Sequence, residues 1–194
     1  MVARFSKIAI FLILFLLFHT FVFAPFLMGS PLSDSIGQKS CCRVTLLKNR
    51  DYFPVLVKTI DNARKEIVLS FFLFKTNGYH NNYPDIILAH LVRAAGRGVN
   101  VKVILETSRD LSQNLDSNNR KTGNRLKKGG IAVYFDHPTT KTHTKVFVID
   151  RRYTFLGSHN LTNSALKYNN ELSILIDSPE MARETLSYIN SLYR

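Results

Sequence analysis

The residues best suited to chemistry lie in one short segment. His143 and Lys145 stand two positions apart in an otherwise apolar run (143–149, HTKVFVI). Because alternate residues of a β-strand point to the same face, we expect these two side chains on one face and Val146 and Val148 on the other. An imidazole can attack phosphorus, and an ammonium group can hold the non-bridging oxygens of a phosphate. The pair supplies part of what chemistry on a phosphate diester requires.

A second polar group follows the next expected strand. Ser158 and Asn160 supply a hydroxyl and an amide, both able to donate to phosphate oxygens. Gly157 stands directly before them and lets the backbone come close to a bound group. Asp150 lies between the two groups, at a turn beside two arginines, where we expect it to cap the turn. These residues complete a candidate phosphate site around one histidine.

Other histidines of the region lack a lysine two residues later, namely His80, His90, His137 and His159. A single histidine is more often structural than catalytic, and the lysine, Gly-Ser pair and asparagine at fixed spacing favour catalysis for His143. We expect His159 to be an exposed spacer. His137 is either an ordinary loop residue, which we favour, or part of the entrance to a cleft.

Strand and helix patterns alternate through residues 43–194. The expected strands are 43–47, 66–74, 99–105, 131–135, 143–149, 153–156 and 171–176. Helices are expected over 54–64, over 84–97, in a segment ending at residue 128, and from residue 179 onward. This order predicts an α/β fold with a mixed, mostly parallel sheet flanked by helices on both faces. Residues 43–194 would form one catalytic domain, without an internal repeat.

Residues 1–28 form a separate apolar segment. Arg4 and Lys7 precede a run from residue 8 to residue 28, close to the ~20 residues that span a bilayer. The segment is a signal anchor, forming one N-terminal transmembrane helix, or a cleaved signal peptide. We favour the anchor because Pro25 disfavours cleavage after Ala24. The positive-inside rule places the domain on the non-cytoplasmic side, periplasmic or extracellular in a bacterium, and secreted after cleavage. In a eukaryote the membrane could belong to an organelle.

Residues 29–42 (GSPLSDSIGQKSCC) are small, polar and turn-rich, which is typical of a linker. Cys41 and Cys42 lie at its end. We favour two free thiols in a tether, because no cluster of Cys and His surrounds them. Lipidation and metal binding are the alternatives.

Positive charge belongs mainly to the domain. The chain holds 26 Lys and Arg against 14 Asp and Glu, a net charge of +12, and residues 43–194 carry +10 of it. Such charge indicates a polyanionic partner, either nucleic acid or an anionic membrane surface. One basic group either grips a phosphate backbone or forms a solvated helix face: Arg120, Lys121, Arg125, Lys127 and Lys128. The polar segments 76–83 and 106–119 could shape a groove, with Tyr79 and Tyr83 stacking on bases.

The two polar groups together resemble the signature of the phospholipase D, or HKD, superfamily, H-x-K-x4-D-x6-G-S-x-N. The six matching residues are His143, Lys145, Asp150, Gly157, Ser158 and Asn160. Glu171 stands where single-motif members carry a carboxylate. In length the chain is most similar to the bacterial single-motif endonucleases, and its apolar N-terminus resembles that of the Zucchini-type mitochondrial enzymes.

The resemblance implies a two-step displacement that needs no metal or other cofactor. His143 would attack phosphorus and form a phosphohistidine, while Lys145, Asn160 and Ser158 bind the phosphate oxygens and Glu171 orients His143. The motif counts Asp150 among its catalytic positions, although we expect a structural role for it. A second HKD histidine would protonate the leaving oxygen and then activate water. Since the chain has one such motif, we expect a homodimer with the site on its two-fold axis.

Three functions remain open from the sequence. The first, which the charge favours, is an endonuclease acting on DNA or RNA. The second is a phospholipase D that releases head groups from phospholipids such as phosphatidylcholine or cardiolipin, which a membrane anchor would support. The third is a tethered nucleic-acid-binding protein without activity, which the intact motif argues against.

Overall fold

The computed structural model describes residues 42–107, 114–137 and 140–193. The predicted anchor over residues 1–28, and the predicted linker up to Cys41, lie outside the described residues. Within the described ranges, no helix has the length and apolar character needed to cross a bilayer. The first strand, β1 (Arg43–Lys48), begins where the sequence predicts it.

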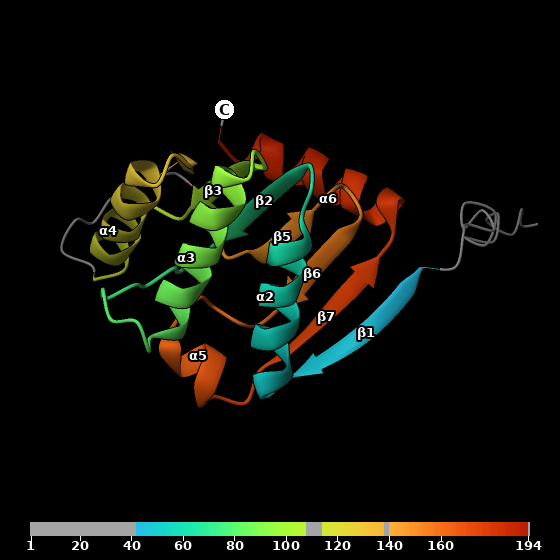
Figure 1. Ribbon diagram of the computed structural model, residues 1–194, viewed down its shortest axis with the longest axis horizontal. Helices are drawn as coiled ribbons and strands as arrows, with labels where there is room; N and C mark the ends of the chain where they lie inside the picture. The colour runs from blue at the N-terminus through green and yellow to red at the C-terminus, as the bar shows by residue number, and fades with distance from the viewer. Residues whose placement is uncertain (1–41, 108–113, 138–139, 194) are drawn as a thin grey trace, which may run out of the picture. The chain divides into compact units, whose positions relative to one another are not determined.

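The described residues form one seven-stranded sheet with the order β1-β7-β6-β5-β2-β3-β4 (Figure 1). The β2–β3 and β3–β4 pairs are parallel. The other four pairs are antiparallel. The prediction of a mixed sheet is confirmed, but the prediction that it is mostly parallel is wrong. The remaining strands are Glu66–Phe71 (β2), Asn100–Leu105 (β3), Ala132–Phe135 (β4), Lys145–Ile149 (β5), Tyr153–Gly157 (β6) and Leu172–Asp177 (β7).

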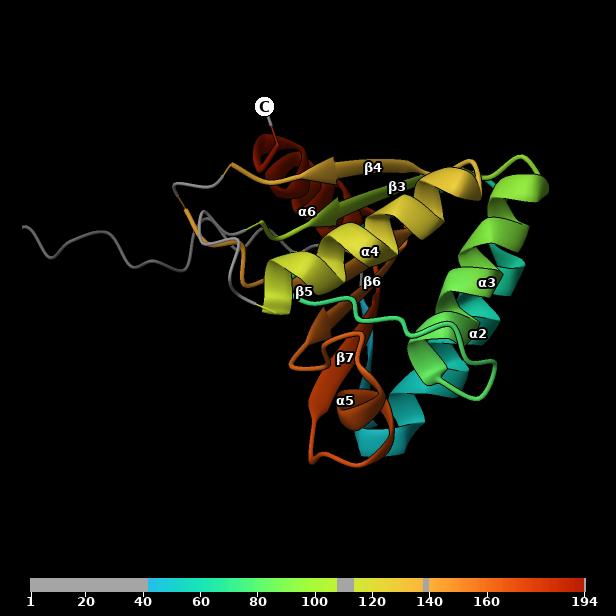
Figure 2. The ribbon, with the colours of Figure 1, turned by 90° about the vertical axis from the view of Figure 1, so that its left-hand side faces the viewer.

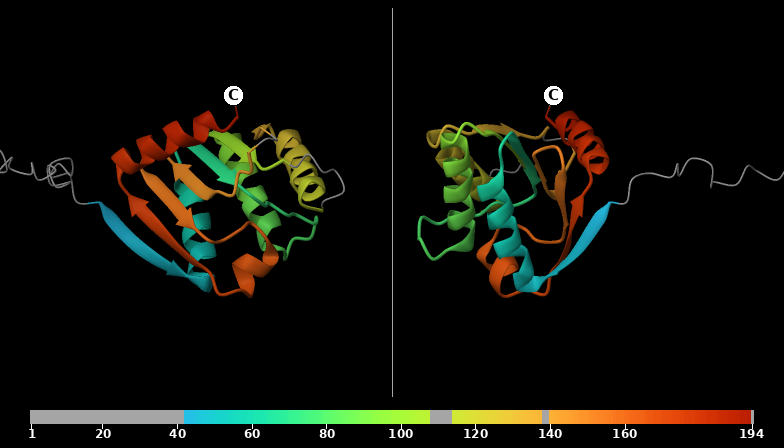
Figure 3. Two further views of the ribbon diagram at one scale, coloured as in Figure 1. Left: turned by 180° about the vertical axis from the view of Figure 1, so that it is seen from behind. Right: turned by 45° about the vertical axis from the view of Figure 1, so that its right-hand side comes forward.

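Helices cover both faces of the sheet, as predicted. Figure 1 shows α2 and α3 in front of the strands, and the rear view in Figure 3 shows α6 running across the opposite face. Figure 2 shows α4 lying along β3 and β4. The helices are Tyr52–Asn62 (α2), Tyr83–Gly96 (α3), Asn114–Lys128 (α4), Asn163–Lys167 (α5) and Pro179–Ser191 (α6), and a 3-10 turn, η2, spans Asn49–Asp51.

The lengths of the connections explain the strand directions. A parallel pair needs a crossover of a dozen or more residues, and α3 and α4 supply the crossovers that lead to β3 and β4. Residues 150–152 alone join β5 to β6, which allows only an antiparallel hairpin. Alternating apolar segments indicate strands, but their directions depend on these connections.

The apolar run of β2 is buried on both faces, which accounts for its composition. Ile67, Leu69 and Phe71 pack into the larger core beneath α2 and α3. Val68 packs with Val146 and the residues of α6 on the other face. The strand lies between β5 and β3, in the interior of the sheet.

The segment after β2 is held by a side chain of α4. Asn119 is fully buried, accepts a hydrogen bond from the amide of Phe74 (2.9 Å), and donates to the carbonyls of Phe72 (2.8 Å) and Glu106 (3.0 Å). These three hydrogen bonds hold the chain where β2 ends at Phe71, three residues earlier than predicted. Asn119 belongs to the polar segment that we expected to shape a groove, and in the structure it supports the interior.

Candidate active site

His143 and Lys145 lie side by side at the start of β5. The Lys145 Nζ is 3.3 Å from His143 Nδ1 and donates to the His143 carbonyl at 3.0 Å. The Phe72 ring lies 4.4 Å from the imidazole, centroid to centroid, and 5.3 Å from Lys145 Nζ. His143 itself precedes the strand, which begins at Lys145 and not at residue 143 as predicted. The expected pairing of imidazole and ammonium is present, with an aromatic wall that sequence reasoning missed.

The electrostatics of this pair favour a nucleophilic imidazole. Desolvation, followed by the positive charges of Lys145 and Lys141, lowers the pKa of His143. Burial also lowers the pKa of Lys145, while the negative charge of Glu171 acts in the opposite direction. A lowered imidazole pKa leaves His143 neutral at physiological pH, the form that can attack phosphorus.

Ser158 and Glu171 form a second part of the site, where β6 and β7 adjoin. The Ser158 hydroxyl donates to Glu171 Oε2 and accepts from the Leu172 amide at 3.0 Å. Asn169 Nδ2 donates to the other oxygen of Glu171 at 3.1 Å. We predicted that this carboxylate orients His143, and its side-chain partners within the described chain are Ser158 and Asn169. Its negative charge nevertheless acts to raise the pKa of Lys145.

Asn160 contributes a polar atom with no partner. Its Oδ1 is buried and makes no hydrogen bond with any described residue. The next residue, Leu161, exchanges backbone bonds with the segment after β2: its amide donates to Leu73, and Lys75 donates to its carbonyl at 2.9 Å. Asn160 is therefore held beside the segment that carries Phe72.

Gly157 is required by the neighbouring strand. A Cβ at this position would overlap Ser173 and the Leu172 carbonyl of β7. We predicted that this glycine lets the backbone approach a bound group. The structure adds a second physical reason for a glycine here, the close approach of β6 and β7.

His159 is buried, and the prediction of an exposed spacer is wrong. Only 1% of the residue is exposed. Its ring stacks on Tyr52 at 4.3 Å, while Nδ1 lies 2.7 Å from Ser173 Oγ and Nε2 lies 2.9 Å from the Asn49 carbonyl. Burial lowers the pKa of His159 against the opposing effects of the Asn49 carbonyl and Glu171. The residue is a neutral structural support under the site.

Asp150 lies at the other end of β5 from Lys145. Its carboxylate accepts hydrogen bonds from the backbone amides of Arg64, Lys65 and Glu66, the shortest being 2.7 Å. Its φ is 55°, a left-handed conformation that Asp tolerates better than most residues. Asp150 was expected to cap its own turn, but its carboxylate caps the segment that leads into β2.

Two buried carboxyl groups hold the segment that enters the site. Glu106 follows β3 and Asp136 follows β4, with 3% and 5% of each residue exposed. The Thr142 amide, one residue before His143, donates to both of them, to Asp136 Oδ2 at 3.2 Å. Burial, and then the adjacent Asp136 carboxyl, raises the pKa of Glu106 to about 7, while the Thr142 amide opposes this. The polar residues that end two parallel strands were the available sequence signal for this pair.

The basic group of α4 is partly committed to internal contacts. Arg120 pairs with Asp116, its Nε 2.6 Å from the carboxylate, and Arg125 pairs with Asp85. Tyr83 stacks on Phe53 with ring centroids 4.1 Å apart, so the face expected to stack on bases is occupied. Tyr79 remains exposed.

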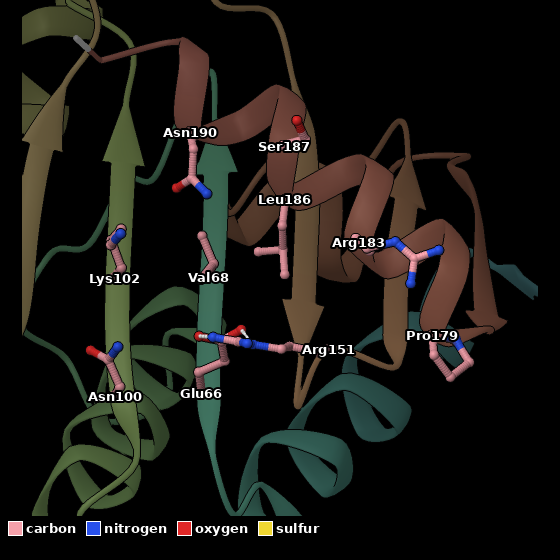
Figure 4. Close-up of a pocket in the computed structure, with 10 residues that line it drawn as sticks. All are labelled: Glu66, Val68, Asn100, Lys102, Arg151, Pro179, Arg183, Leu186, Ser187 and Asn190. Carbon is pink, nitrogen blue, oxygen red and sulfur yellow. Dashed lines mark hydrogen bonds and ion pairs between the residues drawn. The ribbon is translucent and has the colours of Figure 1, made fainter.

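One cavity of the described chain lies away from these residues. It measures about 660 Å³ and opens between α6 and the starts of β2 and β3 (Figure 4). The Glu66–Arg151 ion pair crosses its floor, 2.7 Å from Nε to Oε1. No motif residue from His143 to Asn160 lines it. Within the described ranges, no three His, Cys, Asp or Glu side chains gather to hold a metal ion.

Comparison with known proteins identifies relatives over most of the domain. Residues 56–193 match the family model of the PLD-like domain of cardiolipin synthase. A phospholipase D of Rickettsia bellii is 32% identical over 123 residues, 63% of this chain and 54% of that protein. Cardiolipin synthase B of Salmonella typhi is 31% identical over 121 residues, 62% of this chain and 27% of that protein. The chain thus spans about half the length of the first relative and about a quarter of the second.

Solved structures share the fold. Nuc of Salmonella typhimurium, a phospholipase D family member, gives a TM-score of 0.66 at 24% identity over 78% of this chain and 94% of that one. NucT of Helicobacter pylori gives 0.62 at 22% identity over 78% and 96%. The family model spans well over half of the sequence and includes the whole segment from His143 to Glu171. The chain belongs to the phospholipase D-like family.

Proposed function

We propose that this protein is a metal-independent phosphodiesterase that works through a phosphohistidine and acts as an endonuclease. The observation that carries the proposal is the contact between His143 and Lys145, 3.3 Å from Nδ1 to Nζ. A neutral imidazole beside an ammonium group combines a nucleophile with a charge that stabilises the phosphorane-like transition state.

In this reaction the His143 nitrogen forms a bond to phosphorus as the bond from phosphorus to the leaving oxygen breaks. Lys145 and the Asn160 amide NH2 donate to the non-bridging oxygens. The Ser158 hydroxyl joins them when it turns away from Glu171, which holds it in the free protein. A second imidazole gives the leaving oxygen its proton, then takes a proton from the water that hydrolyses the phosphohistidine. The two histidines would titrate as a coupled pair.

A homodimer would supply that second imidazole. Four large apolar side chains are about half exposed on the sheet face that also carries α6: Val44, Leu46, Leu156 and Leu172. The register places Leu46 and Leu156 on either side of Ile174, in one row across three strands. Ser158 accepts from the Leu172 amide, so this surface adjoins the site. A second copy covering it would bury the side of the site formed by Ser158 and Glu171, and we expect the partner's imidazole to reach the site from there.

Nucleic acid is the substrate we favour. Residues 43–194 carry a net charge of +10, suited to a polyanion. The chain also covers nearly all of Nuc and NucT, and only part of the phospholipase D and cardiolipin synthase relatives. Phospholipid head groups are the second candidate, because those two relatives are the more similar in sequence. An N-terminal anchor with the domain on the non-cytoplasmic side would serve either substrate.

The test is a direct assay of the purified full chain in EDTA. Single-stranded DNA, RNA, duplex DNA and vesicles of phosphatidylcholine or cardiolipin are offered separately. We expect cleavage of nucleic acid by the wild type and none by His143→Ala. Head-group release without nucleic-acid cleavage would replace the nuclease by a phospholipase D.

The dimer is tested by Leu46→Glu/Leu156→Glu, with Tyr188→Glu on α6 as the matched control. Sedimentation should show a monomer for the double variant and a dimer for the control, and activity should follow the dimer. A fully active monomer would refute the shared site.

A further inference from the structure

A groove leads away from Ser158 and Glu171 along the edge of the domain. One depression of about 420 Å³ is lined by both of these residues and by Lys48, Asn49 and Asn170. A second, of about 520 Å³, is lined by the same Lys48, Asn49 and Asn170. It extends the path to Arg50, Lys167 and Tyr168. Because three residues are common to both, the two depressions adjoin, and we call them together the β1–α5 groove.

We propose that the β1–α5 groove binds the nucleic-acid strand flanking the scissile phosphate, with backbone phosphates on Lys48, Arg50 and Lys167 and a base on Tyr168. The inference rests on the proposed nuclease function and deepens it, because it requires a polymeric substrate. It also assigns phosphate binding to residues outside the basic group of α4.

The charges of the groove are available to a ligand. Lys48, Arg50 and Lys167 form no ion pair with any carboxylate of the described chain. Arg50 donates through Nε to the Lys167 carbonyl at 3.2 Å, which leaves its terminal nitrogens for a phosphate. Asp51 is the single carboxylate among the residues lining the outer depression. Arg120 and Arg125 of α4, by contrast, are paired with aspartates.

Tyr168 provides a stacking surface at the outer end of the groove. It is 66% exposed, and Lys167 Nζ lies 5.4 Å from its ring centroid. An exposed ring beside a cation suits a base and its adjoining phosphate, since stacking tolerates any base. No aliphatic side chain lines the outer depression, so it offers no surface for an acyl chain.

The floor of the groove is held rigidly. Asn49 has a φ of 50°, and its amide donates to the Glu171 carbonyl at 2.9 Å. Its Oδ1 accepts from the Glu171 amide at 2.8 Å, and its carbonyl contacts His159. A non-glycine residue persists in this conformation only where its surroundings fix it. The same asparagine thus connects the groove to Glu171, so ligand contacts are pre-organised next to the reacting phosphate.

Dimer symmetry fits this path. A two-fold axis through the site would generate a second β1–α5 groove leading away on the other side of the scissile phosphate. One strand could then occupy both grooves, upstream in one subunit and downstream in the other.

The test compares two full-chain variants that each lose three positive charges. Lys48→Ala/Arg50→Ala/Lys167→Ala removes those of the groove, and Lys58→Ala/Lys65→Ala/Arg93→Ala removes three from elsewhere on the domain. For cleavage of fluorescein-labelled single-stranded 20-mers of DNA and RNA, we expect the groove variant to raise KM about tenfold or more, and the salt-dependence slope of KM to fall by about 2. For bis(4-nitrophenyl) phosphate, which reaches only the central phosphate position, the change in KM should be far smaller. The control variant should match the wild type.

Tyr168→Ala should raise KM for the 20-mers about tenfold, and Tyr168→Phe should restore it, because stacking needs the ring alone. If the wild type cleaves the oligonucleotides and the groove variant has the same KM as the control, the groove proposal is overturned but the nuclease proposal stands. A wild type that hydrolyses bis(4-nitrophenyl) phosphate or lipid but no oligonucleotide would overturn the nuclease proposal, and the groove proposal with it.

Discussion

The two ends of strand β5 carry residues of one sequence motif in opposite environments. At the first end, His143 is exposed, and among the described residues Lys145 donates to the neighbouring histidine alone. At the other end, the Asp150 carboxylate is saturated by three backbone amides. The motif therefore contains two kinds of residue. His143 and Lys145 can still bind a ligand, whereas Asp150 is used up in holding the backbone at the far end of the strand.

The largest effect should come from the exposed end. His143→Ala should lower kcat by about a thousandfold or more, because it removes the nucleophile itself. The melting temperature should stay near that of the wild type, since the side chain is exposed and contacts Phe72 and Lys145 at the edge of the core. His80→Ala, in an exposed loop, is the matched control. Full activity of His143→Ala would show that His143 is not the nucleophile.

The Asp150 end of β5 should affect stability and not the reaction rate. Asp150→Ala removes an ionised acceptor from three amides and places alanine at a φ of 55°. We expect the free energy of unfolding to fall by about 4 kcal/mol, since hydrogen bonds to charged groups contribute 1.5–3 kcal/mol each and are partly replaced by water. Urea denaturation measures the loss. Asp150→Asn should cost less, because it keeps an acceptor and tolerates the left-handed backbone.

The sequence predicts the motif and the succession of elements well, because both depend on local pattern. All seven strands overlap their predicted ranges, although β2 ends early and β5 begins late, and α6 begins at Pro179 behind the Ser178 cap. Periodicity could not predict that most strand pairs are antiparallel, because it does not say which strands lie next to each other.

Side-chain surroundings were the other gap. His159 occupies a variable position of the motif, and its burial depends on Tyr52, more than 100 residues earlier. The role of Gly157 depends on Ser173, in a strand that follows it by one helix. The short helix α5, too brief for a hydrophobic period, was missed altogether.

The carboxyl pair behind His143 offers a pH test of the exposed end. Because the folded-state pKa of Glu106 is raised from 4.5 to about 7, the folded protein holds a proton that the unfolded chain has lost between these values. The free energy of unfolding should therefore fall as pH rises from 4.5 to 7, by at most about 3 kcal/mol, and then level off. Glu106→Gln, which mimics the protonated carboxyl, should flatten this slope. An unchanged slope would show that the pair does not titrate as the burial implies.

The smallest effect should come from a structural residue placed among the catalytic ones. His159 lies between Ser158 and Asn160, yet it is buried against Tyr52 and bonded to Asn49 and Ser173. His159→Gln retains a donor and an acceptor but loses the stacked ring, so we expect about 1–2 kcal/mol of stability to be lost. Below the onset of thermal unfolding, kcat should stay within about threefold of the wild type, because a group that leaves no capacity for ligand takes no part in chemistry. A loss of kcat comparable to that of His143→Ala, with stability unchanged, would mean that His159 takes part in the reaction despite its burial.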